Sequence, residues 1–424
     1  MNLLNPSFQP GNSPEYKKTT LDYFIFLLFF FYGSGLTAFS NNDISLVIMS
    51  GMGFLYMHFS RQEKVDNIFW YVLIYWVLIN FLSWVFVGSR NFSFFTLGGS
   101  VFKLFIGYVF MKIYKEKFIV WFEQTVFFLA LVSLLFFAIQ LLNSDIFSKI
   151  PFNFVDQKRG VEGHWYGFIF HYSSWHPTQN SGFAGEPGGF GYYIGLAMIF
   201  NLILNRGVIN YRFLILALIG LTTFSTNFYL SLILFGIYFI YRSSLFVKLI
   251  SVSLFIPLIL LLYSLPFVGE KLNQYLDETK QFSESTIVKR TRINRTSMFV
   301  NDVRDVEKYP LGRGINETGL KTNIYGEVFE GTNDFSKIAV KYGIFGLIFF
   351  LVIYYRMFRK IGLNLKGSLF FVLIMCMYIA ANSLERDYFA LNLFWLYYLT
   401  REEILEQIFG EYYPEEENNK LAIA

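Results

Sequence analysis

An apolar run of 25 residues reads Phe118-Ile-Val-Trp-Phe-Glu-Gln-Thr-Val-Phe-Phe-Leu-Ala-Leu-Val-Ser-Leu-Leu-Phe-Phe-Ala-Ile-Gln-Leu-Leu142 and holds one charged side chain, Glu123. About 20 consecutive apolar residues are enough for a helix to cross the hydrocarbon core of a bilayer, so this run predicts a transmembrane helix. The rest of the chain agrees, because 54% of its 424 residues are hydrophobic and 16% are charged. Soluble domains carry roughly 25% charged residues.

The sequence predicts an all-α, polytopic integral membrane protein. It is expected to form a single membrane domain over residues 1–424, with about twelve transmembrane helices. Short polar loops separate the apolar runs, and Ser225-Thr226-Asn227 is expected to close a tight helical hairpin. The expected spans lie near residues 22–39, 44–60, 68–87, 94–114, 118–142, 183–204, 211–225, 227–241, 247–265, 335–356, 367–383 and 387–400.

Lysine and arginine gather in every second short loop, which places those loops and both termini in the cytoplasm by the positive-inside rule. The first span would then act as an uncleaved anchor, because the polar residues ahead of it lack a small-residue cleavage site. Residues 401–424 are expected to form an acidic cytoplasmic tail. The formal net charge of +4 is too small and too scattered for a nucleic-acid partner. Basic residues of these loops include Lys17, Lys18, Arg61, Lys64, Lys112, Lys115, Lys117, Arg206, Arg212, Arg242, Lys248, Arg356, Arg359, Lys360 and Lys366.

Two long loops are expected on the outer side, over residues 143–182 and 266–334, and long loops are usually functional. The first is rich in aromatic residues and holds His164, His171 and His176. Its rings suit the C–H faces of sugars, or an aromatic belt at the membrane surface. The histidines lack the regular spacing of a zinc site, so no metal is expected there.

A glycine-rich run, Gly182-Phe-Ala-Gly-Glu-Pro-Gly-Gly-Phe-Gly191, opens the span that follows the first long loop. Pro187 suits the first turn of a helix. Glu186, just ahead of it, stands where exposed N–H groups favour an anion. Two interpretations stay open: Glu186 caps the helix, or its carboxylate lies at the rim of an outward-facing cavity.

The second long loop carries the basic stretch Arg290-Thr-Arg-Ile-Asn-Arg-Thr-Ser-Met-Phe-Val-Asn-Asp-Val-Arg-Asp-Val-Glu-Lys-Tyr-Pro-Leu-Gly-Arg-Gly314. The pattern from about Thr286 to Glu307 is helical, and Arg292 falls on its apolar face. A charge on an apolar face needs a partner. Arginine donates two hydrogen bonds to one phosphate group, so the cluster predicts an anionic ligand, with lipid headgroups as the alternative. The apolar positions of that face are Ile293, Phe299, Val300, Val303 and Val306.

Some function classes are excluded or weakened by what the sequence lacks. It has no Walker loop for ATP and no Asp-x-Asp pair to hold a metal-bound nucleotide sugar. It shows no repeat between its halves of the kind that many secondary transporters carry. An ATP-driven transporter is therefore excluded, and a nucleotide-sugar transferase is disfavoured.

Three segments carry a family resemblance. Arg295-Thr-Ser-Met-Phe299, with the later Tyr309-Pro310-Leu-Gly312-Arg-Gly314, is similar to an Arg…aromatic…Pro-Leu-Gly-x-Gly segment. Thr332-Asn333-Asp334-Phe335, with Lys341-Tyr-Gly343-Ile-Phe-Gly346, is similar to a His-Asn…Gly-x-x-Gly entry to a membrane span. Phe183-Ala-Gly-Glu186-Pro187 is similar to a Glu-Pro motif. In these segments and in its two large outer loops, the chain resembles the O-antigen polymerase and ligase superfamily, whose members act on undecaprenyl-diphosphate-linked glycans.

The resemblance implies a repeat-unit polymerase in the bacterial inner membrane, with its active site on the periplasmic side. Ligase members place a histidine where this chain has Thr332, which favours a polymerase over a ligase. The implied partners are an undecaprenyl-diphosphate-linked oligosaccharide, the lipid bilayer and a chain-length regulator. A ligase and a lipid-linked glycan flippase or other transporter are the alternatives.

This activity sets two chemical tasks. Arginines must stabilise the negative charge that grows on the leaving diphosphate, and the candidates are Arg290, Arg292, Arg295 and Arg313. No cofactor or metal is required if these arginines neutralise the diphosphate. A carboxylate or imidazole must take the proton of the acceptor hydroxyl, and the candidates are Glu186, His176 and Asp334.

Overall fold

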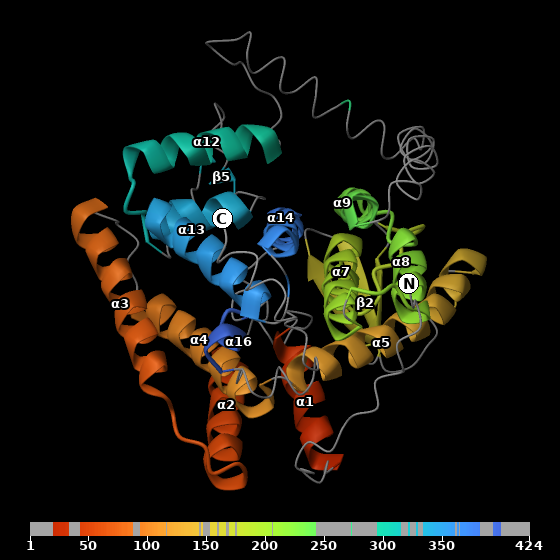
Figure 1. Ribbon diagram of the computed structural model, residues 1–424, viewed down its shortest axis with the longest axis horizontal. Coiled ribbons are helices and arrows are strands. Elements are labelled where there is room, and N and C mark those ends of the chain that lie inside the picture. Colours follow the sequence, from red (N-terminus) through yellow and green to blue (C-terminus); the bar gives the residue numbers. More distant parts are fainter. Residues whose placement is uncertain are drawn as a thin grey trace, which may run out of the picture.

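The computed structural model is mostly helical, as the sequence predicts (Figure 1). The expected span at 247–265 and the acidic tail at 401–424 lie outside the residues that the structure describes. The described residues are 20–33, 43–87, 94–115, 117–143, 146, 153–158, 161–166, 169–173, 176–205, 207–242, 273, 295–314, 321–322, 328–329, 334–360, 363, 365–381 and 393–399.

Among the described helices, 5 are long and apolar enough to cross a membrane, which supports the expected membrane character. The expected number of twelve spans stays a prediction. The long helices are α3 (Asn67–Val87), α4 (Phe94–Tyr114), α5 (Lys117–Leu142), α7 (Pro187–Leu204) and α13 (Asp334–Lys360). Shorter ones are α1 (Thr20–Gly33), α2 (Asp43–Leu55) with its π-helical extension η1 (Tyr56–Ser60), α8 (Tyr211–Leu221), α9 (Thr226–Arg242), α12 (Arg295–Lys308), α14 (Leu365–Ala381) and α16 (Trp395–Leu399).

Local side-chain chemistry sets several helix boundaries. The Asn210 side chain caps α8 by accepting the Phe213 backbone N–H at 3.0 Å. The hairpin between α8 and α9 turns at 222–225, ahead of the expected Ser225-Thr226-Asn227. The hydroxyl groups of Thr222 and Thr223 donate to the carbonyls of the preceding turn at 2.6 and 2.7 Å. Such bonds compete with the helical backbone bonds, and α8 therefore ends early.

Aromatic rings form much of the core between α1, α4 and α5. The Phe26 ring lies 5.3 Å from the Phe110 ring and meets Tyr114 edge-on at 5.2 Å. Phe30 meets Phe122 edge-on at 5.6 Å. Edge-to-face pairs of this kind contribute about 0.5–1.5 kcal/mol beyond the area they bury. Lipid is as apolar as these side chains, so close packing has to hold such helices together.

Two small antiparallel sheets interrupt the helices, which the all-α prediction did not include. The larger joins β1 (Asn153–Lys158), β2 (Val161–Tyr166) and β3 (Phe170–Ser173) in that order, between α5 and α7. Its register pairs Val155 with His164, and Trp165 with His171. The smaller sheet pairs β4 (Lys321–Thr322) with β5 (Val328–Phe329), between α12 and α13.

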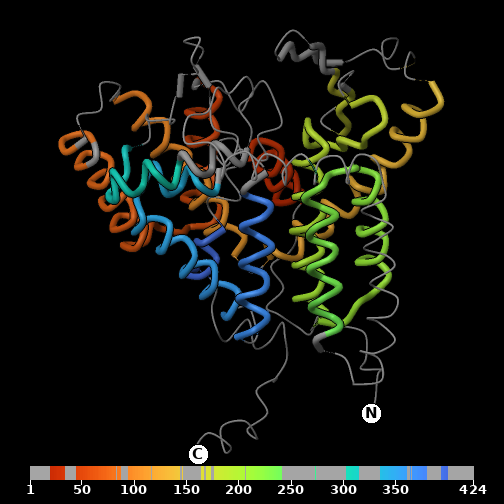
Figure 2. Tube along the Cα trace, turned by 90° about the horizontal axis from the view of Figure 1, so that it is seen from above, coloured from red at the N-terminus to blue at the C-terminus, as the bar shows by residue number. Residues whose placement is uncertain are grey.

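Cross-helix bonds show which helix ends lie together. Ser231, near the start of α9, hydrogen-bonds the hydroxyl of Tyr378, near the end of α14, at 2.5 Å. The Asn180 N–H, just ahead of α7, donates to the Thr222 carbonyl, just past α8, at 2.9 Å. Since α14 follows α13 directly and runs back along it, the end of α14 lies near the start of α13. Helices α7, α9 and α13 therefore all begin at one end. The three-stranded sheet and α12 lie toward this end (Figure 2), which we call the sheet end.

At the opposite end, α1, α5 and α8 begin and α4 finishes. The Tyr114 hydroxyl, at the end of α4, donates to the Asp22 carbonyl in α1 at 2.9 Å. Arg212, in the first turn of α8, pairs with Glu123 of α5 at 3.0 Å. We call this the ion-pair end. The predicted topology makes the sheet end periplasmic and the ion-pair end cytoplasmic.

Candidate functional site

The structure places the described candidate residues at the sheet end, in two groups. Glu186 and His176 belong to the loop between β3 and α7. Arg295 and Asp334 are the first residues of α12 and α13, and Arg313 follows α12. Arg290 and Arg292 lie outside the described residues.

The turn after α12 docks on the start of α13 through backbone hydrogen bonds. The N–H groups of Arg313 and Gly314 donate to the carbonyls of Val340 and Lys341 at 2.8 and 3.0 Å. The Ile344 N–H donates to the Pro310 carbonyl at 3.0 Å. In a regular helix Ile344 would bond to Val340, four residues back. The backbone groups of Val340 and Ile344, which would bond to each other in a regular helix, therefore bond to the turn instead.

Two glycines make this docking possible. Gly343 has φ 71° and ψ −178°, which breaks the helical path inside α13, and this region is essentially restricted to glycine. A Cβ on Gly343 would lie 2.3 Å from the Pro310 carbonyl oxygen. A Cβ on Gly312, which has φ 87°, would lie 2.5 Å from the backbone nitrogen of Gly343. The two segments quoted from the sequence, 309–314 and 341–346, thus interlock directly, a contact that sequence reasoning did not predict.

The interlock holds Arg313 in a defined orientation. Its guanidinium carbon lies 4.9 Å from the centre of the Tyr309 ring, within the range of a cation–π contact. Its Nη1 atom lies 3.4 Å from the Asp305 carboxylate, and about a quarter (26%) of its side chain is exposed. A planar, partly exposed guanidinium of this kind can offer hydrogen bonds to a phosphate group.

The α12 helix packs on α13 through a face different from the predicted one. Asp302 is buried, and its carboxylate accepts the hydroxyl hydrogen of Ser336 at 2.6 Å. Val303, one of the apolar positions of the predicted helix face, is 41% exposed. The apolar periodicity did not indicate the face that contacts α13, because it cannot register a buried carboxylate that has found a hydroxyl donor.

Glu186 stands ahead of α7 with its side chain exposed. Its backbone is extended, with φ −144° and ψ 143°, and its carbonyl accepts the Phe190 N–H at 3.0 Å. Its carboxylate makes no capping hydrogen bond to the helix. Of the two interpretations of Glu186, capping by the side chain is not observed, and the carboxylate lies at the surface of the sheet end.

Side chains of α5, of the turn after α8 and of the loop itself hold the loop that leads to Glu186. The Gln140 amide donates to the carbonyls of Pro177, His176 and Gln179 at 2.7, 3.2 and 3.2 Å. The Asn180 amide donates to the Thr222 hydroxyl at 3.0 Å, and its oxygen accepts the Gly182 N–H at 2.9 Å. Sequence reasoning missed both amides. Gln140 lies inside an apolar run and Asn180 in a polar loop, and neither setting gives any sign of the partner.

The sheet supports the same loop from the other side. Trp165 is 8% exposed and its ring centre lies 4.4 Å from that of His171. A Cβ on Gly185, which has φ 70°, would lie 2.9 Å from the Trp165 ring. Trp165 is therefore part of the packing beneath Gly185 and does not present its face for stacking on a sugar. Trp175, the other tryptophan of this loop, lies outside the described residues.

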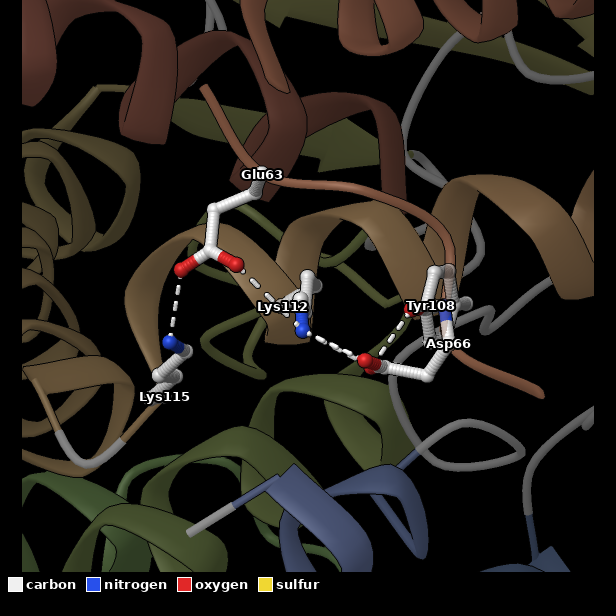
Figure 3. A network of polar contacts seen from close by, with 5 residues as sticks. All are labelled: Glu63, Asp66, Tyr108, Lys112 and Lys115. Carbon is white, nitrogen blue, oxygen red and sulfur yellow. Dashed lines mark hydrogen bonds and ion pairs between the residues drawn. The ribbon is translucent and has the colours of Figure 1, made fainter. Parts of the chain in front are cut away.

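The ion-pair end holds a network of charged side chains between α4 and the segment that joins η1 to α3 (Figure 3). Lys112 lies 2.8 Å from the Asp66 carboxylate and 3.4 Å from that of Glu63, which also pairs with Lys115 at 2.7 Å. Tyr108 donates to Asp66 at 2.8 Å. Burial would raise the pKa of Glu63, but the hydrogen bond and charge of Lys115 and the charge of Lys112 outweigh it and hold that pKa below its ordinary value.

The two ends therefore differ in chemical character. Charges at the ion-pair end satisfy one another, whereas the sheet end carries an exposed carboxylate and a partly exposed guanidinium. Within the described part of the chain, no three His, Cys, Asp or Glu side chains are grouped so that they could hold a metal ion. Comparison with protein-family models, with curated proteins and with solved structures finds no match to this chain.

Proposed function

We propose that this protein is a membrane glycosyltransferase that polymerises the oligosaccharide repeat units of a bacterial surface polysaccharide. The growing glycan on undecaprenyl diphosphate is the donor, and the next lipid-linked repeat unit is the acceptor. In this proposal the protein lies in the inner membrane with about twelve spans, both termini are cytoplasmic and the sheet end faces the periplasm.

One observation carries the proposal: the 309–314 turn docks on the kinked start of α13. The two segments that suggested a lipid-diphosphate enzyme are far apart in the chain, and they fold as one unit. That unit belongs to a helix that is long and apolar enough to cross a membrane, and it presents a guanidinium that stacks on a ring. A ligand attached to a membrane lipid is best recognised by cations fixed at the end of such a helix.

The proposed chemistry follows from the exposed carboxylate of Glu186 and the partly exposed guanidinium of Arg313. The acceptor hydroxyl oxygen forms a new bond to the anomeric carbon of the donor glycan, while the bond from that carbon to the diphosphate oxygen breaks. The diphosphate leaves with the bonding electrons, and Arg295 and Arg313 stabilise its charge, with Arg290 and Arg292 as further candidates. Glu186 takes the proton of the hydroxyl. His176 and Asp334 are the alternative bases.

Deleting the gene in the native host and separating the surface glycan on a gel tests the proposal. A polymerase predicts glycan that stops at one repeat unit. Loss of surface glycan with accumulation of lipid-linked polymer would indicate a ligase instead. Single lipid-linked units trapped on the cytoplasmic face would indicate a flippase, and an unchanged ladder would overturn the proposal.

Substitutions test the assigned residues. In Arg295→Ala and Glu186→Ala variants we expect polymer to fall by about 100-fold or more, while the amount of inserted protein stays the same. Arg304→Ala is the matched control, because Arg304 lies on the exposed side of the same helix as Arg295. Normal polymer in Arg295→Ala and Glu186→Ala would remove both residues from the mechanism.

A further inference from the structure

The face of α12 that contacts α13 and the following turn is acidic and aromatic. Asp302 reaches Ser336 in the first turn of α13, and Asp305 reaches Arg313 in the turn. Tyr309 lies beneath the Arg313 guanidinium. Positions 302, 305 and 309 follow the i, i+3, i+7 spacing of one helix face. The exposed residues of α12, which include Arg304 and Lys308, lie on other faces.

Asp302 is the most buried contact of this face that the structure describes. It is 4% exposed and its partner Ser336 is 5% exposed. A carboxylate rarely enters a packed helix contact, because burial costs it the solvation of its charge unless hydrogen bonds replace water. Here the partner lies in the first turn of α13, where the helix dipole also favours a negative group.

The contact fixes α12 at two points along α13. The Asp302–Ser336 bond holds the first turn of α13, and the interlock of Gly312 with Gly343 holds the chain two turns later. A helix attached at two points can neither rotate about its axis nor slide along its neighbour. Position 295 lies seven residues before Asp302 on α12, which is close to two full turns, so both positions share one face.

We propose that Asp302 is a positioning residue: its bond to Ser336 sets the rotation of α12, and with it the placement of the arginines at positions 295 and 313. The assignment of a diphosphate to those arginines rests on the proposed function, whereas the fixed rotation of α12 does not. Asp302 itself contacts no substrate in this proposal and acts through the helix that it holds. A misplacement of about 1 Å in a positioned group costs as much as 100-fold in rate.

Two kinds of measurement test the proposal. The first compares polymer formation by Asp302→Ala, Ser336→Ala, the double variant and Asp302→Asn, at equal amounts of inserted protein. Asp302→Asn keeps an oxygen that accepts the Ser336 hydroxyl. We expect kcat/KM for the lipid-linked donor to fall by about 10- to 100-fold in each alanine variant. The double variant should fall no further, because both changes remove one bond, and Asp302→Asn should retain most of the wild-type value.

The second measurement is independent of activity. Nitroxide labels are attached to cysteines in an Arg304→Cys, Phe345→Cys protein that also carries Cys376→Ser, which removes the one native cysteine. Both labelled positions are exposed, one on α12 and one on α13. We expect a narrow distance distribution between the labels when Asp302 is retained and when the labelled protein carries Asp302→Asn. The distribution should broaden with Asp302→Ala.

The outcomes separate the two claims. A broadened distribution in Asp302→Ala, together with no polymerase activity in the wild-type protein, would uphold the fixed helix and overturn the proposed function. An unchanged distribution would overturn the positioning role, whatever the activity. Equal loss of activity in Asp302→Asn and Asp302→Ala would also overturn it, because the hydrogen bond would then not be the property that matters.

Discussion

The two ends of the molecule are held together by different means. At the ion-pair end, the carboxylates of Asp22, Glu63, Asp66 and Glu123 each pair with a lysine or arginine of another segment, at 2.6–3.0 Å. At the sheet end, the 310–314 turn meets residues 340–344 through bonds from backbone to backbone. A flexible charged side chain can adjust to a change in its partner. A backbone contact that depends on glycine cannot adjust in this way. The contact at the sheet end should therefore tolerate substitution less well than the ion pairs.

This difference matches the tasks that we assign to the two ends. Transfer of a glycan from a diphosphate requires groups held in fixed geometry. An ion pair between side chains requires only proximity, and the more exposed pairs contribute little on their own. Substitutions at the interlock should therefore lower the free energy of unfolding far more than substitutions in the ion-pair networks.

The largest effect is expected for Gly343→Ala. An alanine there must adopt a backbone conformation reserved for glycine, and its Cβ would lie 2.3 Å from the Pro310 carbonyl oxygen. We expect a loss of about 3 kcal/mol or more in the free energy of unfolding. Thermal unfolding of the purified protein in detergent measures it.

Gly98→Ala is the matched control for the glycine substitution. Gly98 lies in α4, and a Cβ there would meet nothing within 4 Å. Since alanine is favoured over glycine in a helix by about 1 kcal/mol, we expect an unchanged or slightly higher melting temperature. Equal losses in both variants would mean that the interlock contributes nothing specific.

An intermediate effect is expected for Glu123→Ala. The Glu123 side chain is 2% exposed, lies 3.0 Å from Arg212 and accepts the Asn201 amide at 2.9 Å. Removal of the Glu123 carboxylate leaves the Arg212 guanidinium without its ion-pair partner. Because a third (33%) of the Arg212 side chain is exposed, we expect a loss of about 2 kcal/mol, below the usual cost of breaking a fully buried pair.

The double variant Glu123→Leu, Arg212→Met sharpens this expectation. It replaces the pair by apolar groups of similar size, a change that is often neutral. Its melting temperature should lie above that of Glu123→Ala. A double variant less stable than Glu123→Ala would mean that the ion pair makes a net contribution to the free energy of unfolding that apolar groups of similar size cannot replace.

The sequence predicted the long helices well and the polar contacts poorly. The expected spans at 94–114 and 118–142 agree with α4 and α5 to within one residue, because a long apolar run bounded by charge has few alternatives. The strands at 153–173 were missed because their mixture of polar and aromatic residues has no clear period. The first turn of the span expected at 183 belongs to the loop, since α7 begins at Pro187.

The candidate site shows the same limit. Gly312 and Gly343 stood out in the sequence, but they lie in separate segments, and their contact depends on how the chain between them folds. Glu123 was recognised as a charge within a span, yet Arg212 follows it 89 positions later. Pairing across such distances is decided by packing, which apolar periodicity does not encode. Asp302 illustrates the point most clearly, because a carboxylate was not expected on the buried face of α12.

The smallest effect is expected from the titration of Glu63. The pKa of this carboxyl lies below its ordinary value, because Lys115 and Lys112 outweigh the opposing effect of burial. A pKa that is lower in the folded state than in the unfolded state stabilises the fold above the unfolded value, about 4.3. That stabilisation is lost as the pH falls through the folded value. Glu63→Gln should therefore lower the melting temperature at pH 7 and converge with the wild-type protein under acid conditions.

The expected size is below about 1 kcal/mol, since roughly a third (32%) of the Glu63 side chain is exposed and solvent screens the pair. Melting temperatures of the two proteins, measured from neutral pH to about pH 3, would show curves that meet at the acid end. Added salt should shrink the difference at pH 7. Parallel curves would mean that the pKa of the Glu63 carboxyl is the same in the folded and unfolded states, and that its pairs with Lys112 and Lys115 do not stabilise the fold.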